Sequence, residues 1–133
     1  MSTLFSFFLI FAAAAMRVAR HFGLINLPPN FAPIAAIALF AGARIKNRAA
    51  AFFIPLFAML AADAFIGFYD FRILGSVYIS FALSGLIGRA IRKSVTPFRI
   101  IGASLFSSTI FFLITNAAVW FFSGMYSKTI SGL

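Results

Sequence analysis

The chain has 133 residues, of which 63% are hydrophobic and only 10% charged, and its mean hydropathy is +1.07. The apolar residues come in long blocks, and a bilayer crossing takes roughly 20 of them, so the sequence predicts a single all-α integral membrane domain, 1–133, built as a compact bundle of about five transmembrane helices. The net charge of +9 does not indicate nucleic-acid binding, because the Lys and Arg residues stand at the ends of apolar blocks instead of forming a continuous basic stripe.

The first expected span covers about residues 4–21. No positive charge precedes this span, and Arg17 and Arg20 lie in its last turns, so we interpret it as a retained span instead of a signal peptide. Ala15 and Ala19 form a small-xxx-small pair, and this spacing allows another helix to approach closely. The alternative is that the pair arises by chance in an Ala-rich segment.

The second expected span, about 31–45, begins after an irregular stretch from Pro28 to Pro33. Proline removes backbone donors, so no regular helix is expected there, and Asn30 is the candidate N-cap with Pro33 in the first turn. The helix to Ile45 spans only about 23 Å at 1.5 Å per residue, which is less than a hydrocarbon core of about 30 Å. We therefore expect part of this crossing to be non-helical and to fold over or into a pocket.

The third expected span, about 49–68, carries Asp63, and the chain's only other acidic residue is Asp70. A separation of seven residues brings both carboxylates to nearly the same face of a helix. An ionisable side chain within an apolar span is costly and indicates a functional or specifically paired group. Because alternating spans place Arg17 at a comparable depth, we expect Asp63 to pair with Arg17 or Arg20 in the wall of a pocket.

The fourth and fifth spans, about 73–91 and 100–122, carry polar stripes at helical spacing. Ser76, Ser80 and Ser84 recur every four residues, which is typical of a packing face between membrane helices. The fifth span has two adjacent stripes, and Trp120 follows them at the expected membrane interface. These stripes consist of Ser104, Ser108 and Thr115, and of Thr109 and Asn116.

Basic residues predict the orientation. The connections at 44–48 and 89–99 hold seven Lys and Arg residues and the opposite side holds four, so the positive-inside rule predicts a cytoplasmic N-terminus in a bacterial inner (cytoplasmic) membrane. The first span alone argues the opposite, because its only positive charges, Arg17 and Arg20, lie at its C-terminal end.

Alternation also brings a set of donors, acceptors and aromatic rings toward one end of the bundle, beside the proline-rich stretch. Such a cluster is typical of a small-molecule pocket in a helical membrane protein, whereas the alternative is that these polar groups only pair and pack helices. The expected substrate-binding residues are Arg17, Arg20, Asn30, Asp63, Tyr78, Thr115, Asn116 and Trp120.

The sequence does not predict an enzyme. His21 is the only imidazole, and the chain has neither Glu nor Cys to complete a catalytic or metal-binding constellation, so no cofactor and no metal are expected. It also has no Gly-rich loop ending in Lys-Ser or Lys-Thr that would hold ATP phosphates.

Four segments carry a resemblance to an uncharacterised family of small bacterial membrane proteins described as candidate transport proteins. They are NFAPIAAIALFAGA, LAADAFIGFYD, SLFSSTIFFLITNAAVW and YSKTISGL, which together cover about half of the chain from residue 30 onward. In size and architecture this family is similar to the substrate-binding components of energy-coupling-factor transporters. Those components resemble six-helix bundles with an outward-facing pocket, and the resemblance implies one further helix beyond Leu133. We therefore expect either a truncated copy or a bundle in which the sixth helix is dispensable.

The resemblance implies a substrate-binding membrane subunit that captures a small, vitamin- or micronutrient-like solute from outside and depends on energising partner subunits. In several such components an Ala-x-x-x-Ala pattern in the first helix meets the coupling subunit, and Ala15 and Ala19 are the matching positions. The alternative is a non-transporting membrane scaffold or assembly protein.

Overall fold

The computed structural model describes residues 3–26 and 33–132, and all regular structure among them is helical. Five α-helices follow one another, with a short 3-10 turn, η1 (Ile130–Gly132), near the end of the chain. The helices lie on the five expected ranges, with bounds that differ by at most three residues. They are α1 (Thr3–His21), α2 (Pro33–Arg44), α3 (Arg48–Ile66), α4 (Phe71–Ala90) and α5 (Pro97–Phe122).

Polar side chains fix where three of the helices begin. Asn47 caps α3 by accepting a hydrogen bond from the Ala50 amide at 3.1 Å. Asp70 caps α4 in the same way, because its Oδ1 accepts from the Arg72 amide at 2.8 Å. Thr96 caps α5. Such caps satisfy amides that have no partner within the first helical turn, so one of the two acidic residues has a local structural role.

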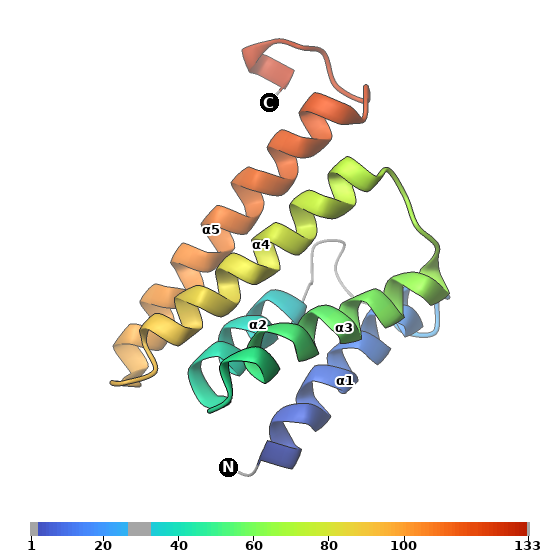
Figure 1. Ribbon diagram of the computed structural model, residues 1–133. Helices are drawn as coiled ribbons and strands as arrows, with labels where there is room; N and C mark the ends of the chain where they lie inside the picture. The colour runs from blue at the N-terminus through green and yellow to red at the C-terminus, as the bar shows by residue number, and fades with distance from the viewer. Residues whose placement is uncertain (1–2, 27–32, 133) are drawn as a thin grey trace.

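The short helix α2 stands between two pairs of longer helices (Figure 1). On one side α1 packs beside α3, on the other α4 packs beside α5, and α2 contacts all four. Successive helices run in alternating directions, so the α2–α3 and α4–α5 turns both lie at the lower left of the view, and the α3–α4 connection lies at the right. The two basic connections therefore share one end of the bundle.

The interior is built from small residues and the outside from large apolar ones. Most buried positions hold Ala, Ser or Gly, and a minority hold larger apolar side chains such as Ile10 and Phe81. Large apolar side chains are instead exposed on α1, α3, α4 and α5. This distribution suits a lipid environment, in which helices associate through close packing of small residues while large apolar side chains face the hydrocarbon. The exposed phenylalanines include Phe8, Phe11, Phe53, Phe57, Phe65, Phe106, Phe112 and Phe121.

Four helices among the described residues, α1, α3, α4 and α5, are long and apolar enough to cross a membrane. Helix α2 has only 12 residues, or about 18 Å of rise, so it is shorter than the hydrocarbon core. The second helix is therefore short, as expected. The predicted irregular stretch falls on residues 27–32, outside the described residues, and α2 begins at Pro33.

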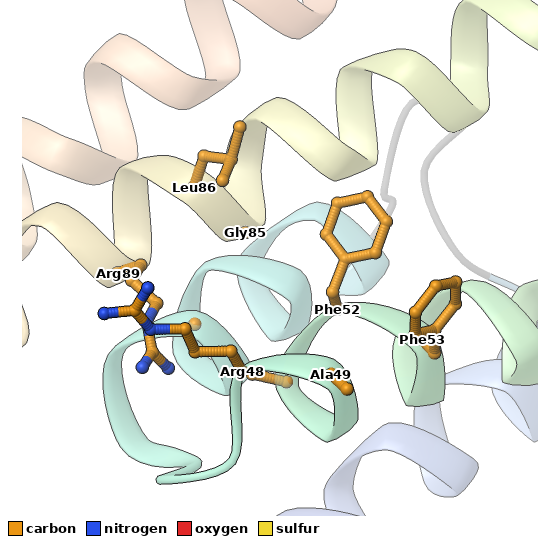
Figure 2. A pocket seen from close by; sticks show the side chains of 9 residues that line it. Arg48, Ala49, Phe52, Phe53, Gly85, Leu86 and Arg89 are labelled. Carbon is orange, nitrogen blue, oxygen red and sulfur yellow. The ribbon is translucent and has the colours of Figure 1, made fainter.

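Glycines allow α2 and α4 to approach at backbone distance. A Cβ added at Gly42 would lie 2.0 Å from the Gly85 carbonyl oxygen, and one added at Gly88 would lie 1.9 Å from the Leu39 carbonyl oxygen. Any side chain at either position would therefore separate the helices. Beside this crossing, a cavity of about 550 Å³ opens between α2, α3 and α4 (Figure 2).

Serines join α4 to α5. Ser76, Ser80 and Ser84 are buried, which confirms the predicted packing stripe. The hydroxyls of Ser80 and Ser84 each donate to the carbonyl four residues earlier, and Ser107 of α5 donates to Ser84 Oγ at 2.7 Å. Ser107 was not part of either predicted α5 stripe, and Ser108, which was, is exposed.

Candidate functional site

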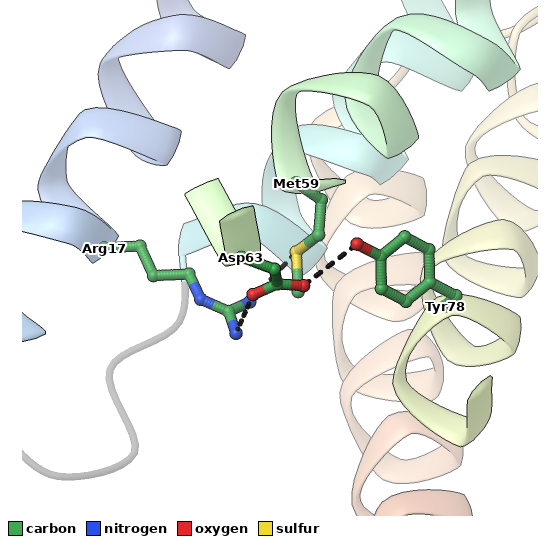
Figure 3. A network of polar contacts seen from close by, with 4 residues as sticks. All are labelled: Arg17, Met59, Asp63 and Tyr78. Carbon is green, nitrogen blue, oxygen red and sulfur yellow. Dashed lines mark hydrogen bonds and ion pairs between the residues drawn. The ribbon is translucent and has the colours of Figure 1, made fainter. Parts of the chain in front are cut away.

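An ion pair links α1 to α3 near one end of the bundle. Asp63 lies three residues before the end of α3 and is fully buried, with 0% of its surface exposed. Arg17, four residues before the end of α1, places Nη2 2.7 Å from Asp63 Oδ1 (Figure 3). The predicted pairing of Asp63 with Arg17 is therefore confirmed.

Two further side chains complete this polar cluster. The Tyr78 hydroxyl, from α4, donates a hydrogen bond to Asp63 Oδ2 at 2.9 Å. Arg17 Nη1 donates to the Met59 sulfur at 3.0 Å, and Met59 lies one turn before Asp63 on α3. One buried carboxylate thus connects three helices, and we call Arg17, Met59, Asp63 and Tyr78 the Asp63 cluster.

The contacts of Asp63 are unequal on its two oxygen atoms. Oδ2 accepts a directed hydrogen bond from Tyr78, whereas Oδ1 has a close ionic contact with Arg17 but no aligned hydrogen bond within the described residues. Each hydrogen bond that a buried carboxylate oxygen accepts stabilises its charge. The Arg17 side chain is 25% exposed, so Arg17 is the more accessible member of the pair.

Tyr69 lies close to the cluster, in the connection between α3 and α4. Burial raises the pKa of its hydroxyl above the ordinary value of 10.0, and the neighbouring Arg17 charge acts in the opposite direction. Tyr69 was not among the expected binding residues, although the alternation of spans places it at the same end of the bundle as Asp63.

The other expected site residues are placed elsewhere or lie outside the description. Thr115 and Asn116 of α5 donate to the carbonyls of Phe111 and Phe112 at 2.8 Å, so their hydrogen bonds stay within their own helix. Trp120 donates from Nε1 to the Ser127 carbonyl at 2.8 Å, in the segment after α5.

Helix α5 packs mainly against α4 and α2, away from the ion pair. Arg20 is half-buried on α1, and Asn30 lies outside the described residues. Of the eight expected binding residues, the structure therefore brings together Arg17, Asp63 and Tyr78.

The small-residue pair on α1 borders a second cavity, of about 450 Å³, between α1 and α3. Ala15 is exposed, Ala19 is half-buried, and Ala61 and Phe65 of α3 form the opposite wall. Neither this cavity nor the one beside the α2–α4 crossing is lined by Asp63 or Arg17. The expectation that the pair forms a pocket wall therefore stays a prediction.

The fold and its surface define the class of this protein: within residues 3–26 and 33–132 it is a helical bundle with four apolar helices of membrane-spanning length, compatible with a multi-pass membrane protein. The chain belongs to the family of unknown function DUF6580, whose model matches residues 1–133. No curated protein and no solved structure matches the chain.

Proposed function

We propose that this chain is the membrane-embedded substrate-binding subunit of an uptake transporter for a small, vitamin- or micronutrient-like solute, without an energising domain of its own. The observation that supports it is the Asp63 cluster, in which a fully buried carboxylate is held by groups from three helices. Placing an ionisable group inside a membrane helix costs free energy, and such groups often mark the binding sites of solutes or ions.

The contacts of the cluster suggest the chemistry of the solute. The partly exposed Arg17 side chain carries a positive charge, and Asp63 Oδ1 accepts no aligned hydrogen bond from the described residues. A solute with a hydrogen-bond donor beside a carboxylate or phosphate group satisfies both side chains at once. Tyr69, at the neighbouring connection, supplies an aromatic ring and a hydroxyl beside Arg17.

The charge distribution supports a cluster that opens to the outside. The Asp63 cluster lies at the end of the bundle opposite the two basic connections, which hold seven Lys and Arg residues. By the positive-inside rule those connections and the N-terminus are cytoplasmic, in a bacterial inner membrane. Solute would then enter from the external face.

A partner subunit would supply the energy for transport. The sequence contains no ATP-binding loop, so the proposed subunit depends on other chains. The cavity beside Ala15 and Ala19 offers a small-residue surface on which a helix of such a partner packs closely.

Mass spectrometry of the gently solubilised protein tests this function. We expect a small molecule to be released when the purified protein is denatured, and energising subunits to be retained with the folded protein. The released compound is then added back at 100 times its dissociation constant, which should stabilise the protein by about 2.7 kcal/mol. The proposal would be rejected if the protein retained no compound and if concentrated mixtures of small molecules extracted from cells did not raise its thermal stability.

A second candidate is a non-transporting membrane scaffold, in which polar groups serve only helix packing. It is favoured by the buried serines of α4 and α5 and by Thr115 and Asn116, whose hydrogen bonds are all internal. In this case Asp63 merely neutralises Arg17. The scaffold predicts unchanged thermal stability in the presence of every small solute, so the same experiment separates the two candidates.

A further inference from the structure

The cavity beside the α2–α4 crossing lies at the basic end of the bundle, far from the Asp63 cluster. Its walls come from the first two turns of α3, the last turns of α4 and the end of α2. Its volume of about 550 Å³ is within the range of ligand sites, roughly 300–1,000 Å³. We call it the basic groove, and its lining consists of Gly42, Arg48, Ala49, Ala51, Phe52, Phe53, Gly85, Leu86 and Arg89.

Two arginines from different helices converge at one end of the basic groove. Arg48 is the first residue of α3 and Arg89 lies in the last turn of α4, and Figure 2 shows their guanidinium groups next to one another. Arg89 is held in place, because Nη1 donates to the Ile45 carbonyl at 3.2 Å. Arg92 brings a further positive charge to this end, where its Nη1 donates a hydrogen bond to the Lys46 carbonyl oxygen at 3.2 Å.

The chain has no side-chain carboxylate to neutralise these arginines. Its only two, Asp63 and Asp70, are engaged toward the opposite end, by the ion pair with Arg17 and by the cap of α4. Asp63 is about 22 Å from Arg48 along α3, and Asp70 about 28 Å from Arg89 along α4. Among the described residues, no carboxylate lies within ion-pair distance of Arg48 or Arg89. The counter-charge must therefore come from another molecule or from dissolved ions.

The rest of the basic groove is apolar and reaches the lipid-facing surface. Phe53 is 64% exposed and Leu86 57% exposed, while Phe52 is half-buried between them (Figure 2). The groove runs from a charged end at the helix termini to apolar walls about 7 Å deeper along α3. A free inorganic anion would use the arginines but gain nothing from these walls. A phospholipid matches both, with its phosphate at the surface and its acyl chain beside the aromatic rings.

We propose that the basic groove binds an anionic glycerophospholipid, with its phosphate between Arg48 and Arg89 and one acyl chain along Phe52, Phe53 and Leu86. Guanidinium groups bind phosphate oxygens through paired charge-assisted hydrogen bonds. The bound phosphate removes the repulsion between the two arginines and joins α3 to α4 at the end where the α2–α3 and α4–α5 turns meet. This site is independent of the proposed solute site and of the orientation of the chain.

Native mass spectrometry and thermal unfolding in detergent test this site with three probes: phosphatidylglycerol, phosphatidylcholine and inorganic phosphate. We expect the wild-type protein to retain phosphatidylglycerol in preference to phosphatidylcholine and to be stabilised by it. Arg48→Gln should weaken that binding roughly fivefold, since each basic residue near a lipid surface is worth about 1 kcal/mol. Arg48→Lys should keep most of it. The matched control is Arg44→Gln, an exposed arginine of the same end that does not line the groove, and it should bind like the wild type.

Arg48→Gln is the decisive variant, because Arg89 also holds the α2–α3 turn and its replacement risks the fold. Equal binding of both lipids would show a groove that selects only for acyl chains and would overturn the proposal. Stabilisation by inorganic phosphate as strong as that by phosphatidylglycerol would overturn the lipid as occupant. If Arg48→Gln and Arg44→Gln weakened phosphatidylglycerol binding equally, the binding would depend on the overall positive charge of this end and not on the groove, which would also overturn the proposal.

Discussion

Removing one partner of the Arg17–Asp63 pair should destabilise the protein unequally, depending on which charge remains. Arg17→Gln leaves a carboxylate that is fully buried, with the Tyr78 hydrogen bond as its only directed contact among the described residues. Breaking a buried pair in this way costs about 3–5 kcal/mol. Asp63→Asn leaves Arg17, which is 25% exposed and four residues from the end of α1, so its long side chain can turn toward the membrane surface. That change should cost only about 1–3 kcal/mol.

The double variant decides whether the two residues act as a pair. Because it leaves no uncompensated charge, it should be less destabilised than the sum of the single variants, by more than about 1 kcal/mol. Reversible unfolding in mixed detergent micelles measures the three free-energy differences. Additive losses, or a larger loss in Asp63→Asn than in Arg17→Gln, would refute the reasoning from burial.

Three further predictions concern other parts of the fold. Gly88→Ala should lower the free energy of unfolding by about 1–3 kcal/mol, because its Cβ meets the α2 backbone, whereas Gly75→Ala, whose Cβ meets nothing within 4 Å, should be neutral or stabilising. The raised pKa of Tyr69 favours its neutral form in the folded state, so stability should fall as pH rises above 10.0, and less steeply in Tyr69→Phe. Single cysteines at Asn47 and Ser94 should resist labelling from outside intact cells, and labelling of either from outside would contradict the N-in orientation.

The sequence was sufficient for the helices and for the central ion pair. Long apolar blocks separated by charged turns mark membrane helices strongly, because uncompensated charges cannot lie within them. Asp63 is the one acidic residue within an expected span, and alternation placed Arg17 at its depth, where the structure shows the ion pair. The short second helix was also predictable from its length between Asn30 and the basic turn.

The packing of individual faces was less predictable. Helical spacing shows which residues share a face but not which neighbour that face meets, so Ser107, the α5 partner of Ser84, was missed. Thr115 and Asn116 had suggested a site, yet such side chains can bond to the carbonyl four residues earlier in their own helix. The role of α2 depends on contacts with all four other helices, which no local pattern reveals.

The most direct test of the proposed solute site compares two chemically identical changes, Tyr78→Phe and Tyr126→Phe. Tyr78 bonds to Asp63 in the cluster, whereas Tyr126 is exposed in the segment after α5. Native mass spectrometry of protein extracted from its own membrane should show a bound small molecule in the wild type and in Tyr126→Phe, and a much smaller bound fraction in Tyr78→Phe. Equal bound fractions in all three proteins, or no bound molecule in the wild type, would contradict the account.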